Sequence, residues 1–232
     1  MAGYARPELL VDTDWLATHL DDPNVRVVDA DYPLSFARAH IPGAVGHLGP
    51  NIYLKTADGE TFMMEDATFA QTMERMGIGD DTTVVVYDSH QSLYAARFWW
   101  MLSVHGHRDV RILNGGWHSW IAESRPVSLK PAAPRSVTLT PRRNDVIRAT
   151  CDLVRDAIGR SDSVILDVRT DAEWTGANDR GNKRRGHVPG AVHLEWVNFM
   201  TNDDRVVFKS ADDLRTMLNE RGVTPDKNVY TY

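Results

Sequence analysis

The sequence predicts an α/β fold of two similar domains, each a parallel sheet flanked by helices. Two observations lead to this prediction. Apolar strands alternate with segments of helical periodicity, which is the order that builds parallel sheets. In addition, motifs of the first half return in the second half, which indicates an internal duplication.

The first half contains the elements of one such domain. Val25 to Asp29 is a short apolar strand ending in aspartate, and residues 66–76 have the pattern of an amphipathic helix with Asp66 as a capping candidate. Val84 to Tyr87 is apolar throughout, as in a parallel strand buried on both faces. The other predicted elements of this half are a helix over 93–104, a strand over 110–113 and a helix over 117–122.

The second half repeats the pattern after a proline-containing stretch. We predict a first domain over residues 1–125, a linker over 126–148 with four prolines, and a second domain over 149–232. The second domain begins its sheet with a strand at 164–167 that also ends in aspartate. A helix over 210–221, with Ser210 as its capping candidate, and a strand over 229–232 follow.

Composition excludes several classes of protein. The 232 residues are 42% hydrophobic and 25% charged, with a net charge of −6, which is typical of a folded domain and lacks the basic footprint of a nucleic-acid binder. The longest apolar run, 98–102, is too short to span a membrane. No His, Cys and carboxylate cluster predicts a metal site. The single cysteine, Cys151, favours a reducing, cytoplasmic location.

The spacing of the repeat shows how far the second copy extends compared with the first. Gly77 and Gly222 are 145 positions apart, as are Tyr87 and Tyr232, and a polar insertion over 175–185 explains the different offsets upstream. The first unit continues for about 38 residues beyond Tyr87, through elements that a parallel sheet needs. We therefore expect the second domain to be incomplete within these 232 residues. We expect it to be completed by residues after Tyr232, or by a cleaved C-terminal piece acting as partner.

Two copies of one motif carry a family resemblance. Asp29 precedes His-Ile-Pro-Gly-Ala at 40–44, and Asp167-Val-Arg precedes Gly-His-Val-Pro-Gly-Ala at 186–191. The sequence resembles the rhodanese family, specifically the tandem-domain sulfurtransferases. The resemblance implies transfer of a sulfane sulfur from thiosulfate or 3-mercaptopyruvate to cyanide or a thiol. The sulfur is carried as a cysteine persulfide, with no cofactor.

The resemblance also implies where the nucleophile stands. The family's active cysteine directly follows the second domain's strand, which makes it the residue immediately after Tyr232. The matching residue of the first domain is Asp88, which is no nucleophile for sulfur, so the first domain is expected to be catalytically silent. None of the 232 residues is then the catalytic nucleophile, and we expect Cys151 to be inert and far from that strand end.

Two arginines are candidate substrate-binding residues. Arg169 follows Asp167 at the carboxyl end of a strand, where a guanidinium can hold the sulfonate of thiosulfate or the carboxylate of mercaptopyruvate. The alternative is a surface ion pair with Asp171 or Glu173. Arg185 is either an anion-attracting residue at the pocket rim or part of a solvated charged run.

Three residues are expected to shape the site without taking part in the chemistry. Asp167 ends the strand, and His187, like His40 of the first domain, is expected to tie its turn to the preceding strand by hydrogen bonds. Gly190 and Gly43 are expected to supply a turn conformation that a β-carbon disfavours.

Two other functions remain open from the sequence alone. One is an inactive rhodanese-fold binding or regulatory module, since Asp88 is no nucleophile and Cys151 is not at the expected position. The other is a cysteine phosphatase, because some dual-specificity phosphatases share the rhodanese fold. The loop beyond Tyr232 separates them. A short loop opening with cysteine favours sulfur transfer, a longer loop ending in arginine favours a phosphatase, and any other first residue favours the inactive module.

Overall fold

The computed structural model describes residues 3–46, 53–55, 61–130, 132–133 and 135–232. The chain divides into two compact units. Unit 1 comprises residues 5–145 with the short segment 202–207, and unit 2 comprises residues 146–201 and 208–232 with the N-terminal residues 3–4. The predicted linker stretch up to Asp145 is thus grouped with unit 1, although two of its prolines, 131 and 134, lie outside the described residues.

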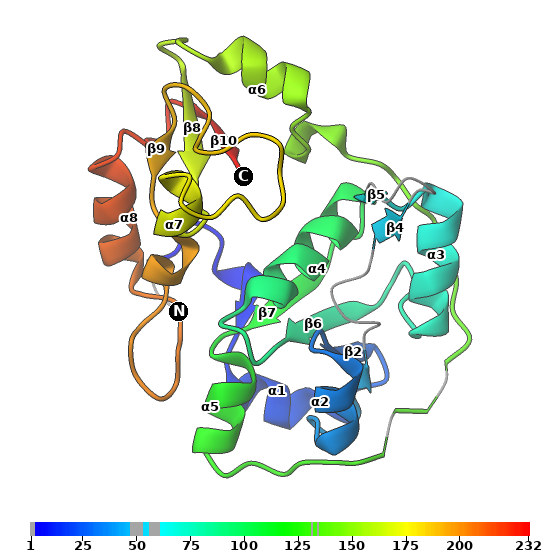
Figure 1. The fold of residues 1–232 in the computed structure, drawn as a ribbon. Helices are drawn as coiled ribbons and strands as arrows, with labels where there is room; N and C mark the ends of the chain where they lie inside the picture. The colour runs from blue at the N-terminus through cyan, green and yellow to red at the C-terminus, as the bar shows by residue number, and fades with distance from the viewer. Residues whose placement is uncertain (1–2, 47–52, 56–60, 131, 134) are drawn as a thin grey trace. The chain divides into compact units, whose positions relative to one another are not determined.

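Unit 1 is built on a parallel sheet with the strand order β1-β7-β6-β2-β3. Its helix α4 packs against β6 and β7 (Figure 1). The elements of unit 1 are β1 (Leu10–Val11), α1 (Thr13–His19), β2 (Val25–Asp29), α2 (Pro33–Arg38), β3 (Val45–Gly46), β4 (Tyr53–Lys55), β5 (Thr61–Met63), α3 (Asp66–Arg75), β6 (Thr83–Tyr87), α4 (Leu93–Val104), β7 (Val110–Leu113) and α5 (Gly116–Ala122). The antiparallel pair β4–β5 was not predicted.

The core of unit 1 explains why these segments fold as they do. Leu16 of α1, Val27 of β2, Val85 of β6 and Trp120 of α5 are buried in one apolar cluster together with Tyr87. The alternation of strand and helix therefore buries both faces of the central strands, as the continuous apolar run of β6 predicts.

Unit 2 has a smaller described sheet, of order β10-β8-β9, whose strands are parallel. The helix α6 packs against β8. The elements of unit 2 are α6 (Cys151–Ala157), β8 (Ser163–Asp167), α7 (Asp171–Trp174), β9 (Val192–His193), α8 (Ala211–Asn219) and β10 (Asn228–Thr231), with a short 3-10 turn at Trp196–Phe199. Another 3-10 turn, Asp145–Ile147, begins at the last residue of the 5–145 segment of unit 1 and ends in unit 2. A further 3-10 turn at Pro7–Leu9 precedes β1.

The predicted helix caps have different outcomes. Ser210 caps α8 by accepting a hydrogen bond from the Asp213 amide at 3.1 Å, which confirms the prediction. Asp66 is not a cap, because Glu65 occupies the N-cap position without a side-chain bond. The Asp66 carboxylate instead accepts from Arg143 at 3.2 Å.

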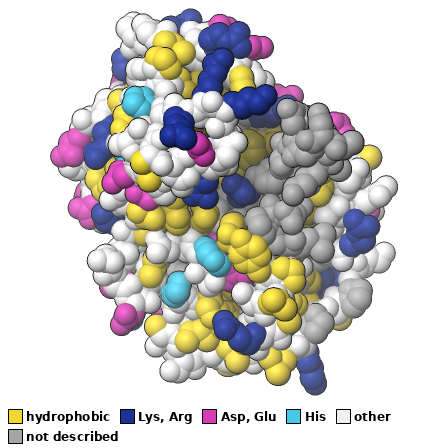
Figure 2. Space-filling model, viewed as in Figure 1, with side chains coloured by type: hydrophobic (Ala, Val, Ile, Leu, Met, Phe, Trp, Pro, Cys, Tyr) yellow, Lys and Arg dark blue, Asp and Glu magenta, His cyan; other side chains and the backbone are white. Residues whose placement is uncertain are grey.

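The duplication is visible in the strand register. The Ala30 amide donates to the Tyr87 carbonyl at 2.8 Å, and the Val168 amide donates to the Tyr232 carbonyl at 3.0 Å. Each tyrosine therefore lies beside the aspartate that ends the neighbouring strand, and residues 87 and 232 are equivalent in the two units. Among the described residues, no helix is long and apolar enough to cross a membrane. On the face drawn in Figure 2, Lys and Arg side chains lie among Asp and Glu side chains.

Candidate active site

Tyr232 is the centre of a hydrogen-bonded frame at the carboxyl edge of the unit 2 sheet. Its hydroxyl accepts from the Val188 amide at 2.9 Å and bonds to the Asp167 carboxylate. Burial raises the pKa of the Tyr232 hydroxyl, so it remains a neutral donor at physiological pH. The frame joins the end of β10, the end of β8 and the turn before β9, which are three parts of one sheet edge.

Unit 1 contains the same frame. The Tyr87 hydroxyl donates to Asp29 Oδ2 at 2.7 Å and accepts from the Ile41 amide at 3.0 Å. From the sequence, the two tyrosines served only as markers of the repeat, and the hydrogen bonds by which their hydroxyls link the strand ends to the turns were not predicted. The signal was their identity at the same place in both copies, each at the end of a strand.

Arg169 is held by the aspartate that precedes it. Its Nε and Nη2 donate to the two carboxylate oxygens of Asp167 at 3.0 and 2.5 Å, and Nη2 also donates to the Gly186 carbonyl at 2.9 Å. Its guanidinium lies 4.9 Å from the centre of the Tyr232 ring. The predicted ion-pair alternative with Asp171 or Glu173 is therefore wrong in its partner, because the buried Asp167 is adjacent and otherwise uncompensated.

The pair has a clear electrostatic consequence. Burial acts to raise the pKa of Asp167, but the hydrogen bonds from Arg169 outweigh it and hold that pKa below its usual value. Bonds to the carboxylate raise the pKa of Arg169 in turn. Both groups are charged at neutral pH, and the Arg169 side chain keeps 29% of its surface exposed, so it remains accessible to a ligand.

The histidine of the turn over 186–190 bonds to a helix and not to the preceding strand. His187 Nδ1 bonds to the Trp174 carbonyl of α7 at 3.0 Å, and its ring stacks on Trp174 with a centroid distance of 3.4 Å. His40 Nδ1 likewise bonds to the Phe36 carbonyl of α2 at 2.9 Å. The expected partner was therefore wrong, because a helix end with unbonded carbonyls lies beside each turn.

The glycines of the two turns behave as the sequence indicates. Gly190 has a φ of 76° and Gly43 a φ of 78°, a region that residues with a β-carbon rarely adopt. Arg185 precedes the second turn and pairs with Asp179 at 3.1 Å, with 70% of its side chain exposed.

Asp88 shows how this fold holds an anion after the strand that ends in tyrosine. The carboxylate is buried and accepts four backbone N–H groups at 2.8–2.9 Å, from His90, Ser92, Tyr94 and Ala95. Burial raises the pKa of Asp88, while the N–H groups of Ala95, His90 and Ser92 act in the opposite direction. The loop 88–95 and the first turn of α4 thus form a cradle of amides around one negatively charged side chain.

Cys151 lies nearer to Tyr232 than expected. It is the exposed first residue of α6. With Val188, Thr231 and Tyr232, it lines a cavity of about 420 Å³ in unit 2. The expectation that it lies far from the strand end is wrong, because α6 begins beside the carboxyl edge of the sheet. Within the described residues, no group of three or more His, Cys, Asp or Glu side chains is placed to hold a metal.

Comparison with known proteins agrees with this architecture. The family model for the rhodanese-like domain matches residues 12–123 and 150–232. The sulfur carrier protein TtuD of Thermus thermophilus is 36% identical over 99% of this chain and 84% of its own length. A putative thiosulfate sulfurtransferase SseA of Mycobacterium tuberculosis is 34% identical over all of this chain and 79% of its own length.

A solved structure is similar as well. The crystal structure of SseA from Escherichia coli, described as a 3-mercaptopyruvate sulfotransferase with the rhodanese fold, superposes with a TM-score of 0.84 at 28% identity. The match covers 96% of this chain and 87% of that one.

Proposed function

The chain belongs to the rhodanese family and is a sulfurtransferase, and from this premise we propose that it moves a sulfane sulfur through a cysteine persulfide. The donor is thiosulfate or 3-mercaptopyruvate, and the acceptor is cyanide or a thiol. The nucleophile is a cysteine directly after Tyr232. We place the reaction in the cytoplasm and assign it no cofactor.

The repeated tyrosine frame carries the proposal. Tyr87 and Tyr232 make equivalent bonds, so the residue after Tyr232 corresponds to Asp88. In unit 1 that position is surrounded by four amide donors. A cysteine in an equivalent loop has its pKa lowered by the same kind of donors, and the resulting thiolate is the nucleophile that sulfur transfer needs.

The proposed reaction proceeds in two balanced steps. The thiolate attacks the outer sulfur of thiosulfate, a new S–S bond forms, and sulfite leaves with the electron pair of the bond that breaks. Cyanide then attacks the outer sulfur of the persulfide, thiocyanate leaves, and the thiolate is restored. With a thiol acceptor, its thiolate takes the same sulfur and becomes a persulfide.

Arg169 is proposed to bind the anionic end of the donor. Three bonds of Nε and Nη2 fix its orientation, and 29% of the side chain stays exposed. The exposed part of the guanidinium can therefore donate to an oxygen of a sulfonate or carboxylate. Arg185 is proposed to attract the anion at the rim, since it is largely exposed. Asp167, His187 and Gly190 are proposed to hold the conformation of this carboxyl edge of the unit 2 sheet without taking part in the chemistry.

Intact-mass measurement tests the proposal on the protein carrying the residues that follow Tyr232. Incubation with thiosulfate should add the mass of one sulfur atom, and cyanide should remove it. Replacing the residue after Tyr232 by serine should abolish the addition and lower turnover at least about 10³-fold. A residue other than cysteine at that position would favour the inactive module. Sulfur loading that survives the serine variant would contradict the assignment.

A further inference from the structure

Arg26 is a buried cation with almost no compensation. It is the second residue of β2, is 1% exposed, and its Nε has no hydrogen-bond partner among the described residues. The hydrogen bond from its Nη2 to the Ala133 carbonyl is long at 3.4 Å. A buried guanidinium without a counter-charge is costly, and such groups normally have a paired anion.

The fold makes room for this guanidinium at Gly77. A β-carbon on Gly77 would lie 2.2 Å from Arg26 Nη2 and 2.9 Å from its Nε, and Gly77 has a φ of 73°. Two independent features therefore require glycine at this position: the backbone conformation and the close approach of the cation. The guanidinium consequently lies directly against the backbone of residue 77.

A second arginine lies close to the first. Arg135 Nη1 donates to the Pro23 and Val25 carbonyls at 2.8 and 2.9 Å, on either side of the start of β2. Burial first, and repulsion from Arg135 second, lower the pKa of Arg26 to about 10. Among the described residues, neither arginine is in an ion pair with a carboxylate, so the two positive charges lie close together without a directly paired negative one.

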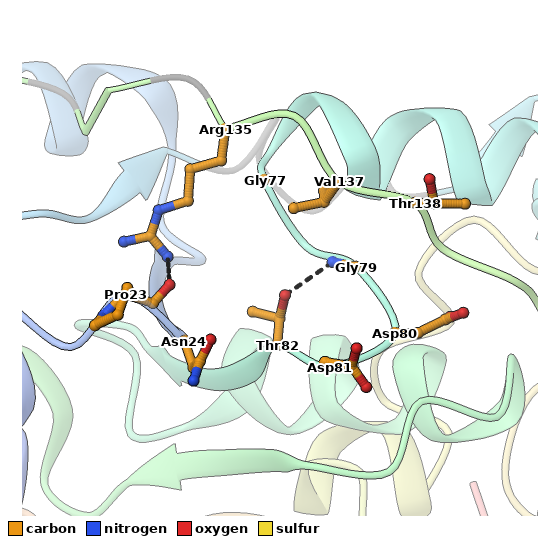
Figure 3. Close-up of a pocket in the computed structure, with 10 residues that line it drawn as sticks. All are labelled: Pro23, Asn24, Gly77, Gly79, Asp80, Asp81, Thr82, Arg135, Val137 and Thr138. Carbon is orange, nitrogen blue, oxygen red and sulfur yellow. Dashed lines mark hydrogen bonds between the residues drawn. The ribbon is translucent and has the colours of Figure 1, made fainter.

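A cavity of about 360 Å³ opens beside the two arginines. Arg135, Gly77 and Asn24 line it, and Figure 3 shows Arg135 pointing toward Pro23 at one end, while Asp80 and Asp81 lie at the other. The Asp80 carboxylate is already engaged, since it accepts from the Thr140 amide at 2.7 Å. The end of the cavity near Arg135 and Gly77 is therefore its positive end.

We propose that this cavity binds a small, doubly charged oxyanion such as sulfate or phosphate at the end formed by Arg135, Gly77 and the underlying Arg26. The anion would supply the missing counter-charge, with Arg135 contacting it directly. Arg26 does not line the cavity but lies against Gly77, which does, so it would contribute through its positive field. The site lies wholly in unit 1. It does not depend on the proposed chemistry at Tyr232.

Thermal unfolding of the protein in inorganic phosphate, with sodium chloride at equal ionic strength as reference, tests this site. Phosphate should raise the Tm in a saturating manner, since a ligand that binds only the folded state stabilises it. Arg135→Gln should weaken the apparent affinity about 10- to 100-fold, the loss expected for a charge-assisted contact. Titration calorimetry with phosphate measures the same affinity directly, and it remains informative if a variant has a lower Tm in chloride.

Arg26→Met gives an independent readout. It removes the buried charge at similar volume, so it should leave the Tm in chloride unchanged or raise it, and it should abolish the effect of phosphate. Arg38→Met, which removes an exposed arginine of the same unit, is the matched control and should retain the effect. Arg169→Ala should also retain it, which separates this site from the proposed donor site.

Two results would overturn the proposal. One is the absence of any phosphate effect beyond the chloride reference. The other is a phosphate effect in Arg26→Met and Arg135→Gln that is as large as in the unchanged protein. A phosphate monoester distinguishes the two sources of the ligand. An ester effect equal to that of inorganic phosphate would support an esterified ligand in the cavity, whereas an effect of the inorganic anions alone would support a free oxyanion.

Discussion

Asp29 and Asp167 occupy equivalent positions in the two units, yet their electrostatic surroundings are opposite. Each ends a buried strand and bonds to the hydroxyl of the equivalent tyrosine. Two residues further along, unit 2 has Arg169, which neutralises its aspartate, whereas unit 1 has Asp31, a second carboxylate. Burial, opposed by the Tyr87 hydrogen bond, raises the pKa of Asp29 to about 6, while that of Asp167 stays below its usual value.

The surroundings of the two tyrosines also differ. Tyr87 is fully buried, with the Trp117 ring of α5 stacked at a centroid distance of 6.3 Å and Trp120 in the same core cluster. Tyr232 lines a cavity instead. The comparison teaches that the hydrogen-bonded frame belongs to the shared fold, whereas the charge beside it is specific to each unit. Of the two equivalent positions, the one in unit 2 holds Arg169 and the one in unit 1 holds Asp31, which is why we assign the anionic donor to unit 2.

The largest predicted effect comes from breaking the ion pair between Asp167 and Arg169, which distinguishes unit 2 from unit 1. Asp167→Asn removes the partner of Arg169 inside a buried setting and should cost about 3 kcal/mol of unfolding free energy. Asp29→Asn should cost at most about 1 kcal/mol, since it loses one hydrogen bond but also removes an uncompensated buried charge. Denaturant titration of both variants measures the difference. Equal losses would show that the two aspartates play the same role.

Arg169→Ala tests the functional side of the same contrast. Loss of a charge-assisted contact to the donor costs about 2–3 kcal/mol, which corresponds to a rise in donor KM of about 30- to 150-fold. Arg169→Lys, which keeps the charge but not the planar fork, should show a smaller rise. The dependence on cyanide should change little in both. Steady-state kinetics with thiosulfate measures this, and an unchanged donor KM would remove Arg169 from the site.

Much of the fold was predictable because its signals are local or repeated. The apolar run that became β6 predicts burial on both faces of that strand, and the two copies of the motif support each other. The partner of Arg169 was not predictable, because three acidic residues lie within four positions of it and only the fold shows that Asp167 is the buried one. The position of Arg26 opposite Gly77 was hidden for the same reason, since the two are 51 residues apart in sequence.

The raised pKa of Asp29 predicts a pH dependence confined to unit 1. Its pKa is about 6 in the folded chain against 3.8 as the ordinary value, so between these values the folded state binds more protons than the unfolded state. Stability from this group is therefore present below about pH 4 and lost as the pH rises through about 6, by about 3 kcal/mol in all. Asp29→Asn should flatten this part of the stability profile. An unchanged profile would show that Asp29 is ionised throughout.

The smallest predicted effect concerns Cys151. This thiol is exposed and lines the cavity beside Tyr232, so it is near the proposed nucleophile but lies on a different element, the start of α6. The tyrosine frame assigns the reactive position to the end of β10, and nothing in unit 1 places a functional group at the start of α1. Cys151→Ser should therefore leave the rate of sulfur transfer within about twofold, since an exposed conservative change has little effect on stability. Turnover with thiosulfate and cyanide, together with the mass of the sulfur-loaded protein, measures this. A large loss of turnover in a folded Cys151→Ser variant would mean that the cavity beside Tyr232 contains the true sulfur carrier, and that the equivalence of Asp88 with the residue after Tyr232 has no catalytic meaning.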